Sequence, residues 1–278
     1  MAMTINTNTF SLNAQRNTAG TQNTLQTAMQ RLSSGLRVNS AKDDSAGLAI
    51  AERMSAQTRG MNVASRNAND GISLAQTAEG SLGKVGDALQ RMRELAVQSA
   101  NGTNNDDDRA NLQAEFDQLG EEVTRIITGA KFNGTDLLNA PTTDFVFQVG
   151  AGTVADVDTI TVASADMDMS AVSTAVTGLD ISADGDAART AMDTLDDQIT
   201  AVTTGRAVMG AVQNRFDSVI SNLATSSENL SAARGRIMDA DFASETMNLS
   251  RAQILQQAGT AMISQANQLP QQVLSLLR

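Results

Sequence analysis

Apolar side chains recur at alternating steps of three and four residues along four stretches of the 278-residue chain. A repeat of 3.5 residues places a narrow apolar seam on one side of a long helix, and partner helices must cover that seam. One such stretch is equally typical of an ordinary amphipathic core helix, but four of them favour a bundle of long helices. The four seams are Ala75, Ala78, Leu82, Val85, Leu89, Met92 and Ala96; Leu112, Phe116, Leu119, Val123, Ile126 and Ala130; Met209, Val212, Phe216, Val219, Leu223, Leu230, Ala233 and Ile237; and Leu255, Ala258, Met262, Ala266, Leu269, Val273 and Leu276.

Polar residues and turn formers indicate where these helices begin and end. Short polar segments at 43–45 (Asp-Asp-Ser), 106–108 (Asp-Asp-Asp) and 239–241 (Asp-Ala-Asp) precede helical stretches, and their side-chain oxygens can accept the free N–H groups of a first turn. The run at 239–241 is also open to interpretation as a metal-binding pair, but no third oxygen ligand has suitable spacing, so capping is favoured.

Four further positions interrupt the helical pattern. Asn101-Gly102 and Asn133-Gly134 predict breaks, and Pro141 closes the N-terminal helical half. Pro270 lies inside the fourth seam, where we expect the helix to kink or end.

The middle of the chain has a different pattern. Residues 144–149 and 158–162 alternate and are rich in β-branched or aromatic side chains, so they predict two strands around the turn region Gly150–Gly152. Residues ~141–182 should therefore form a small β-rich insertion, with helix resuming near Asp184.

The composition argues against an enzyme. Cys and His are absent, which removes the thiol nucleophile, the thiolate metal site and the commonest general base. The chain also lacks a zinc-protease motif, a Gly-x-Ser-x-Gly elbow and a P-loop. We expect no cofactor, and we interpret methionines such as Met92, Met209 and Met262 as adaptable core filler.

The charge is concentrated in the middle. The formal net charge is −11, and residues 141–200 alone hold eleven acidic side chains and one basic one, Arg189. No basic stripe is present to meet phosphates, so nucleic-acid binding is not expected. No apolar run approaches the ~20 residues of a membrane span, and the N-terminus does not have the pattern of a secretory signal peptide.

Both chain ends carry very little charge. Residues 1–36 contain Arg16 and Arg31 as their only charged side chains, and residues 249–278 contain Arg251 and Arg278. Ordering a thin helix costs about 1–2 kcal/mol of backbone entropy per residue, and isolated helices are marginal in water. We therefore expect both ends to fold when neighbouring copies surround them. Flexible tails remain the alternative.

Several stretches strongly resemble conserved segments of the bacterial flagellins. They are QRLSSGLRVNSAKDD at 30–44, SRNANDGISLAQTAEG at 65–80, LQRMRELAVQSANGTN at 89–104, MGAVQNRFDSVISNL at 209–223, SRAQILQQAG at 250–259 and QANQLPQQVLSLLR at 265–278. The resemblance covers about 1–140 and 185–278. A hook–filament junction protein is the alternative within this class, and it should not match the last two segments so closely.

The resemblance implies a mainly α fold in three parts. Residues 1–44 and 240–278 would form a terminal coiled-coil domain that lines the filament channel. Residues 45–140 and 185–239 would form a rod of long antiparallel helices, and residues 141–184 a variable, β-rich outer domain. The assembly seam of the terminal helices is expected at Leu25, Met29, Leu32, Leu36, Leu255, Met262, Leu269, Val273 and Leu276.

The resemblance also implies partners and a location. The chain would polymerise with copies of itself into a secreted, extracellular filament for swimming motility. It would leave the cell by the flagellum's type III export route, with an export chaperone on its C-terminal segment, and it would meet filament-cap and hook-associated proteins. The residues Arg91, Leu95, Gln98 and Glu115 match a patch contacted by a vertebrate innate-immune receptor and by neighbouring subunits.

Overall fold

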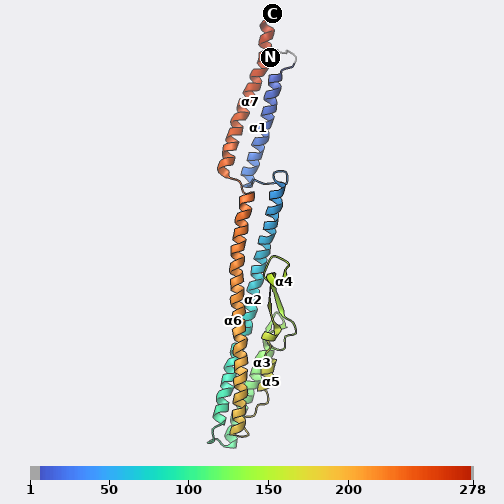
Figure 1. Cartoon of the computed structure of the whole chain (residues 1–278). Coiled ribbons are helices and arrows are strands. Elements are labelled where there is room, and N and C mark those ends of the chain that lie inside the picture. Colours follow the sequence, from blue (N-terminus) through green and yellow to red (C-terminus); the bar gives the residue numbers. More distant parts are fainter. Residues whose placement is uncertain (1–6, 277–278) are drawn as a thin grey trace. The chain divides into compact units, whose positions relative to one another are not determined.

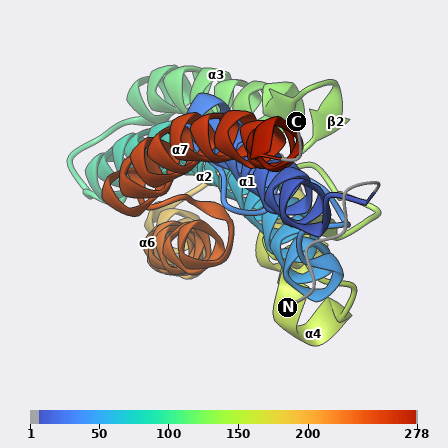
Figure 2. The same cartoon turned by 90° about the horizontal axis from the view of Figure 1, so that it is seen from above.

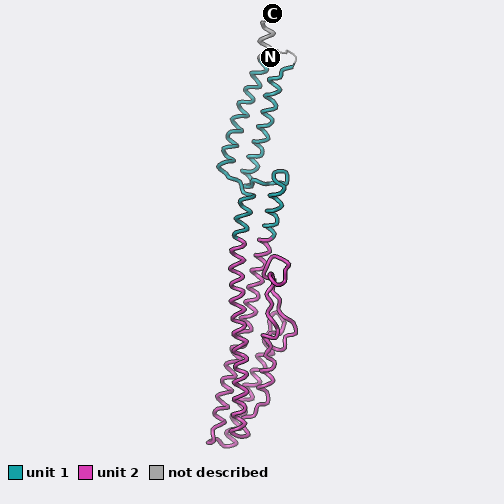
Figure 3. The backbone as a smooth tube through the Cα atoms, in the orientation of Figure 1, with its two compact units in different colours: residues 1–56, 228–278 teal, residues 57–227 magenta. Residues whose placement is uncertain are grey.

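The computed structural model describes residues 7–276, and it describes side chains as far as residue 268. Two compact units are present (Figure 3). The terminal unit combines residues 1–56 and 228–278, and the middle unit comprises residues 57–227. Each unit is described below by itself.

Long helices dominate the chain and four short strands interrupt them (Figure 1). In chain order the elements are α1 (Thr9–Ser34), α2 (Ser45–Ser99), α3 (Asp106–Gly129), β1 (Lys131–Phe132), β2 (Thr135–Asp136), β3 (Phe145–Gln148), α4 (Ala155–Asp158), β4 (Thr159–Val162), η1 (Ser164–Asp166), α5 (Ser170–Val176), α6 (Gly185–Met238) and α7 (Phe242–Leu276). The mainly α fold with a small β part is thus confirmed.

The middle unit packs α3 and the portions of α2 and α6 within it around one apolar core. All seven residues of the first predicted seam are fully buried there, which confirms that seam. In α3, Phe116 and Val123 are buried as predicted, whereas Ile127 takes the core position next to a half-buried Ile126. Met209 and Phe216 of α6 complete the centre of the core.

The two predicted strands form an antiparallel hairpin in the middle unit. The register pairs Phe145 with Val162 and Phe147 with Ile160. The Phe147 ring meets Phe216 of α6 edge-on, with ring centroids 5.4 Å apart and an interplanar angle of 85°, so the hairpin is fastened to the helical core. The same insertion also contains α4, η1 and α5, which the alternating pattern did not predict.

Polar caps begin the helices where the sequence predicted helix starts. Asp44 accepts the backbone N–H of Gly47 at 2.8 Å in the first turn of α2. At α3 the cap is Asn105, one residue before the acidic run, and it forms a reciprocal capping box with Asp108. The acidic run therefore occupies the first turn, where carboxylates stabilise the helix by interacting with the positive end of its dipole.

The last helix begins as predicted, and of the two outcomes expected at Pro270, a kink or an end, the end does not occur. Asp241 accepts the backbone N–H of Ala243 at 3.0 Å, so it caps α7. Pro270 does not end this helix, because α7 extends to Leu276.

The core around Phe216 generates a testable prediction. A Cβ atom added at Gly71 would lie 2.5 Å from the tip of the Phe216 ring, which is buried and held by Phe147. We expect Gly71→Ala to lower the free energy of unfolding by about 1–3 kcal/mol through overpacking.

Gly80→Ala is the matched control in the same helix, because nothing lies within 4 Å of a Cβ there. It should be neutral or stabilising by up to ~1 kcal/mol through helix propensity. Urea unfolding of the three chains provides the measurement, and equal midpoints for the two variants would contradict this packing.

Candidate assembly surface

The two ends of the chain lie side by side as α1 and α7 in the terminal unit (Figure 2). Three contacts mark the antiparallel register. The Asn8 amide donates to the carbonyl of Ala266 at 2.8 Å, Thr18 lies against Gly259, and Arg31 donates to Glu245 at 3.0 Å. Residues more than 200 positions apart in sequence are thus held together.

Small and polar side chains line the covered face of this pair. The more buried positions of both helices follow a repeat of three and four; in α1 they are Ser11, Ala14, Thr18, Thr21, Leu25, Ala28, Arg31 and Leu32, and in α7 they are Glu245, Asn248, Leu249, Ala252, Gln256, Gly259, Ile263 and Ala266. Small residues bring two helix backbones close but bury little apolar area. The two helices therefore approach closely, but the hydrophobic effect stabilises their contact only weakly.

The ion pair between Arg31 and Glu245 sits at one end of the pair. Glu245 is 8% exposed, and its partner side chain is 30% exposed. Removing one partner of a buried pair leaves an uncompensated charge, so this contact fixes register more than it stabilises.

Backbone contacts join the inner ends of the terminal segments. Gly35 has φ +72, a conformation that favours glycine, and its carbonyl accepts the N–H of Ala240 at 2.9 Å. Arg37 donates its backbone N–H to Met238 at 2.6 Å and its guanidinium to Ile237 at 2.7 Å. A basic side chain thereby satisfies a free carbonyl at the end of α6.

Large apolar side chains on α7 remain uncovered. Met247, Ile254, Leu255 and Met262 are 63%, 65%, 51% and 62% exposed. At 3.6 residues per turn they share one stripe, roughly a third of a turn from the face that meets α1. We call these four residues the α7 apolar stripe.

The predicted seam residues divide between the covered and uncovered faces. Leu25 and Leu32 are half-buried, whereas Met29 is 56% exposed. Leu36 packs against the small cluster of Val38, Ala51 and Met238.

In α7 the two assembly-seam residues whose side chains are described lie on the uncovered side. Leu255 and Met262 belong to the α7 apolar stripe, so Met262 is not core filler in this chain. The side chains of Leu269, Val273 and Leu276 lie outside the described residues. Sequence reasoning missed the facing row with Gly259, because glycine and alanine carry little weight in an apolar pattern.

The predicted receptor patch lies on α2 and α3. The Arg91 guanidinium donates to Glu115 at 2.9 and 3.1 Å and to Glu94 at 2.9 Å. These hydrogen bonds, to Glu94 first and Glu115 second, raise the pKa of Arg91. Gln98 is exposed, but Leu95 is 1% exposed and lies in the core beneath the patch.

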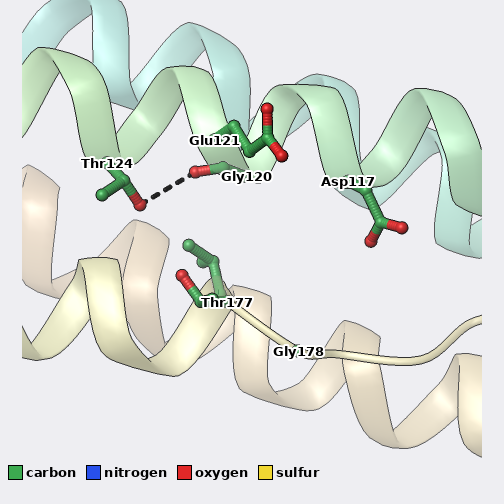
Figure 4. Close-up of a pocket in the computed structure, with 7 residues that line it drawn as sticks. Asp117, Gly120, Glu121, Thr124, Thr177 and Gly178 are labelled. Carbon is green, nitrogen blue, oxygen red and sulfur yellow. Dashed lines mark hydrogen bonds between the residues drawn. The ribbon is translucent and has the colours of Figure 1, made fainter.

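A hollow lies between α3 and the end of α5 (Figure 4). Its polar lining consists of the carboxylates of Asp117 and Glu121 and the hydroxyls of Thr124 and Thr177. Thr124 donates to the carbonyl of Gly120 at 3.0 Å, and Gln113 donates to Asp117 at 2.7 Å. Thr177 likewise donates to the carbonyl of Ser173, so neither hydroxyl donates to a carboxylate.

No group of three or more Asp and Glu residues in the described part of the chain could hold a metal ion. Among the described helices, none is long and apolar enough to cross a membrane.

Paired helices from opposite chain ends, an uncovered apolar stripe and a bundled middle unit define a class of self-assembling helical subunits. The model of the bacterial flagellin N-terminal helical region matches residues 5–143, and that of the C-terminal helical region matches residues 192–277. The chain therefore belongs to the flagellin family. It is a structural subunit of the extracellular flagellar filament and not an enzyme.

Individual relatives agree with this assignment. A flagellin of Halalkalibacterium halodurans is 51% identical over 99% of this chain and 100% of its own length. A flagellar filament 33 kDa core protein of Treponema phagedenis is 42% identical over 99% of this chain and all of its own length. The crystal structure of Bacillus cereus flagellin is similar with a TM-score of 0.50 and 33% identity, covering 61% of this chain and 94% of that one.

The close approach of α7 to α1 can be tested at Gly259. A Cβ atom there would lie 2.6 Å from the Thr18 hydroxyl oxygen, which is held by a 2.8 Å hydrogen bond to Ala14. We expect Gly259→Ala to separate the helices at a cost of about 1–3 kcal/mol and to raise the critical concentration for polymerisation.

Two further variants control this experiment. Gly20→Ala, where nothing lies within 4 Å of a Cβ, should polymerise as well as the parent chain. Thr18→Ala should rescue Gly259→Ala, because it removes the obstructing hydroxyl. A Gly259→Ala chain that polymerises as readily as Gly20→Ala would contradict the pairing.

The charged contacts of the middle unit predict an acid response. The side-chain hydrogen bonds from Arg93 lower the pKa of Asp196, and those from Ser182 lower the pKa of Asp180. A carboxylate with a lowered folded-state pKa contributes stability that is present above its unfolded value of about 3.9 and is lost as the pH falls through the lower folded value.

We therefore expect the urea midpoint of the monomer to fall as the pH is lowered from about 6 to about 3. Asp196→Asn should reduce this pH dependence, because it removes one of the carboxylates. Identical pH profiles for the parent chain and the variant would disprove a contribution from Asp196.

Proposed function

We propose that this flagellin polymerises through the α7 apolar stripe, and that α1 and α7 become stably ordered when other copies cover it. The observation that carries the proposal is the exposure of Ile254, Leu255 and Met262 on one side of α7. Burying a side chain of this size contributes about 1.5–3 kcal/mol. Stacked copies can bury the stripe repeatedly, whereas a single chain leaves it in water.

The weakness of the α1–α7 interface supports folding on assembly. Ordering the 26 residues of α1 alone costs on the order of 1 kcal/mol per residue in backbone entropy. Half of the covered positions are Ser, Thr, Ala or Gly, and these side chains bury little apolar area. Neighbouring copies would supply the missing burial, as in coupled folding and binding.

The same reasoning extends to the three-part organisation. The terminal domain, residues 1–44 and 240–278, would line the filament channel, because it holds the uncovered apolar stripe. The rod, residues 45–140 and 185–239, would pack around it, and the acidic segment 141–184 would project outward into water. This three-part division is part of the same proposal.

An uncovered stripe also needs protection before assembly. We expect secretion by type III export, with an export chaperone covering the C-terminal segment, and then handover to the filament cap and to hook-associated proteins. The receptor patch remains a proposal for Arg91, Gln98 and Glu115, whose exposed side chains suit a charged contact. Leu95 would act there only as support from below.

Substitutions on the α7 apolar stripe test the proposed assembly directly. We expect an Ile254→Ser, Leu255→Ser chain to remain monomeric at concentrations at which the parent chain forms filaments. Electron microscopy and sedimentation of seeded samples provide the measurement. Circular dichroism of the monomer should be nearly unchanged, because these side chains make few contacts within the chain.

The matched control places the same change on the middle hairpin. Val146 and Val157 are 61% and 77% exposed, and both lie in the segment proposed to project outward. A Val146→Ser, Val157→Ser chain should therefore still form filaments. The proposal is wrong if the α7 variant polymerises at the parental critical concentration.

A further inference from the structure

Methionine exposure differs sharply between parts of the chain. The sequence has thirteen methionines, of which Met1 and Met3 lie outside the described residues. Met29, Met247 and Met262 are 56%, 63% and 62% exposed, and all three lie on α1 or α7. The rest are buried or half-buried; they are Met54, Met61, Met92, Met167, Met169, Met192, Met209 and Met238.

Exposure decides which thioethers a soluble oxidant can reach. Hydrogen peroxide transfers one oxygen atom to the methionine sulfur: its O–O bond breaks, an S–O bond forms, and the other oxygen leaves as water. The sulfur loses two electrons and the peroxide gains them. The product is a polar sulfoxide, which sulfoxide reductases can return to the thioether.

We propose that Met29, Met247 and Met262 are a hydroperoxide-sensitive modification site that switches off polymerisation of the monomer. The proposal rests on the proposed assembly through α7. Met247 and Met262 belong to the α7 apolar stripe, beside Ile254 and Leu255. Oxidation places a strong hydrogen-bond acceptor in an apolar stripe, and burying it there without a donor is unfavourable.

The same chemistry predicts protection after assembly. Once neighbouring copies cover the stripe, peroxide no longer reaches Met247 or Met262. Filaments should therefore tolerate an oxidant concentration that inactivates free monomer. The fully buried Met92 and Met209 resist in both states, because the core of the middle unit encloses them.

The experiment treats full-length monomer with hydrogen peroxide, removes the oxidant and seeds polymerisation. Peptide mass spectrometry should find sulfoxide first at Met29, Met247 and Met262. The critical concentration should rise by about tenfold or more, the factor expected when an unpaired polar group is buried. Treatment with both classes of methionine sulfoxide reductase should restore polymerisation, and pre-formed filaments should show at least several-fold slower oxidation at Met247 and Met262.

Two leucine variants assign the effect to particular sulfurs. The chain with Met29→Leu, Met247→Leu and Met262→Leu keeps apolar side chains that peroxide does not oxidise, so its critical concentration should be unchanged by treatment. The chain with Met54→Leu, Met61→Leu and Met192→Leu should remain sensitive. If the first variant assembles poorly without treatment, recovery of the oxidised parent chain by the reductases decides the question.

The outcomes separate this inference from the proposed assembly. The inference is overturned if chains with sulfoxide at Met247 and Met262 polymerise at the untreated critical concentration, if the first leucine variant loses assembly on treatment, or if reduction does not restore the parent chain. The proposed assembly fails by a different result, namely filaments formed by the Ile254→Ser, Leu255→Ser chain.

Discussion

A pair of helices can cover only one side of each partner, and this constraint governs the terminal unit. The side of α7 that meets α1 carries small residues such as Ala252 and Gly259, whereas the four large residues of the α7 apolar stripe lie on another side. Close backbone approach and the exposed apolar stripe are therefore on different faces of α7. The first face sets the register of the two chain ends, and the second face is the one that we propose to contact other copies.

In the middle unit, other elements of the same unit bury the apolar side chains. Its α2 seam is completely covered by α3, α6 and the insertion, and the Phe147–Phe216 contact ties the hairpin to the same core. The apolar seam of this unit is covered without neighbours, whereas the α7 apolar stripe of the terminal unit is not covered within the chain. In the proposed assembly, other copies cover this stripe and the terminal pair gains order as the subunit joins a polymer.

Much of this organisation was predictable from the sequence, since long seams with strong periodicity specify helices and their core faces. The α2 seam from Ala75 to Ala96 is an example, because partners within the chain cover it. The face of α7 that meets α1 was not predictable, since Gly259 and Ala252 act by being small. Leu95 was placed on the surface by resemblance, yet it packs beside Met92 and Ala96 in the core. The short α4 and α5 were missed because four to seven residues are too few to establish a helical period.

Amide hydrogen exchange on free monomer and on filaments tests most directly the claim that the terminal pair depends on neighbouring copies. The account predicts rapid exchange along 9–34 and 242–268 in dilute monomer and protection of the same amides by roughly a hundredfold or more in filaments. Amides of α2 between residues 74 and 96 should be protected in both states. Terminal amides that are already as well protected in the dilute monomer as in the filament would contradict it.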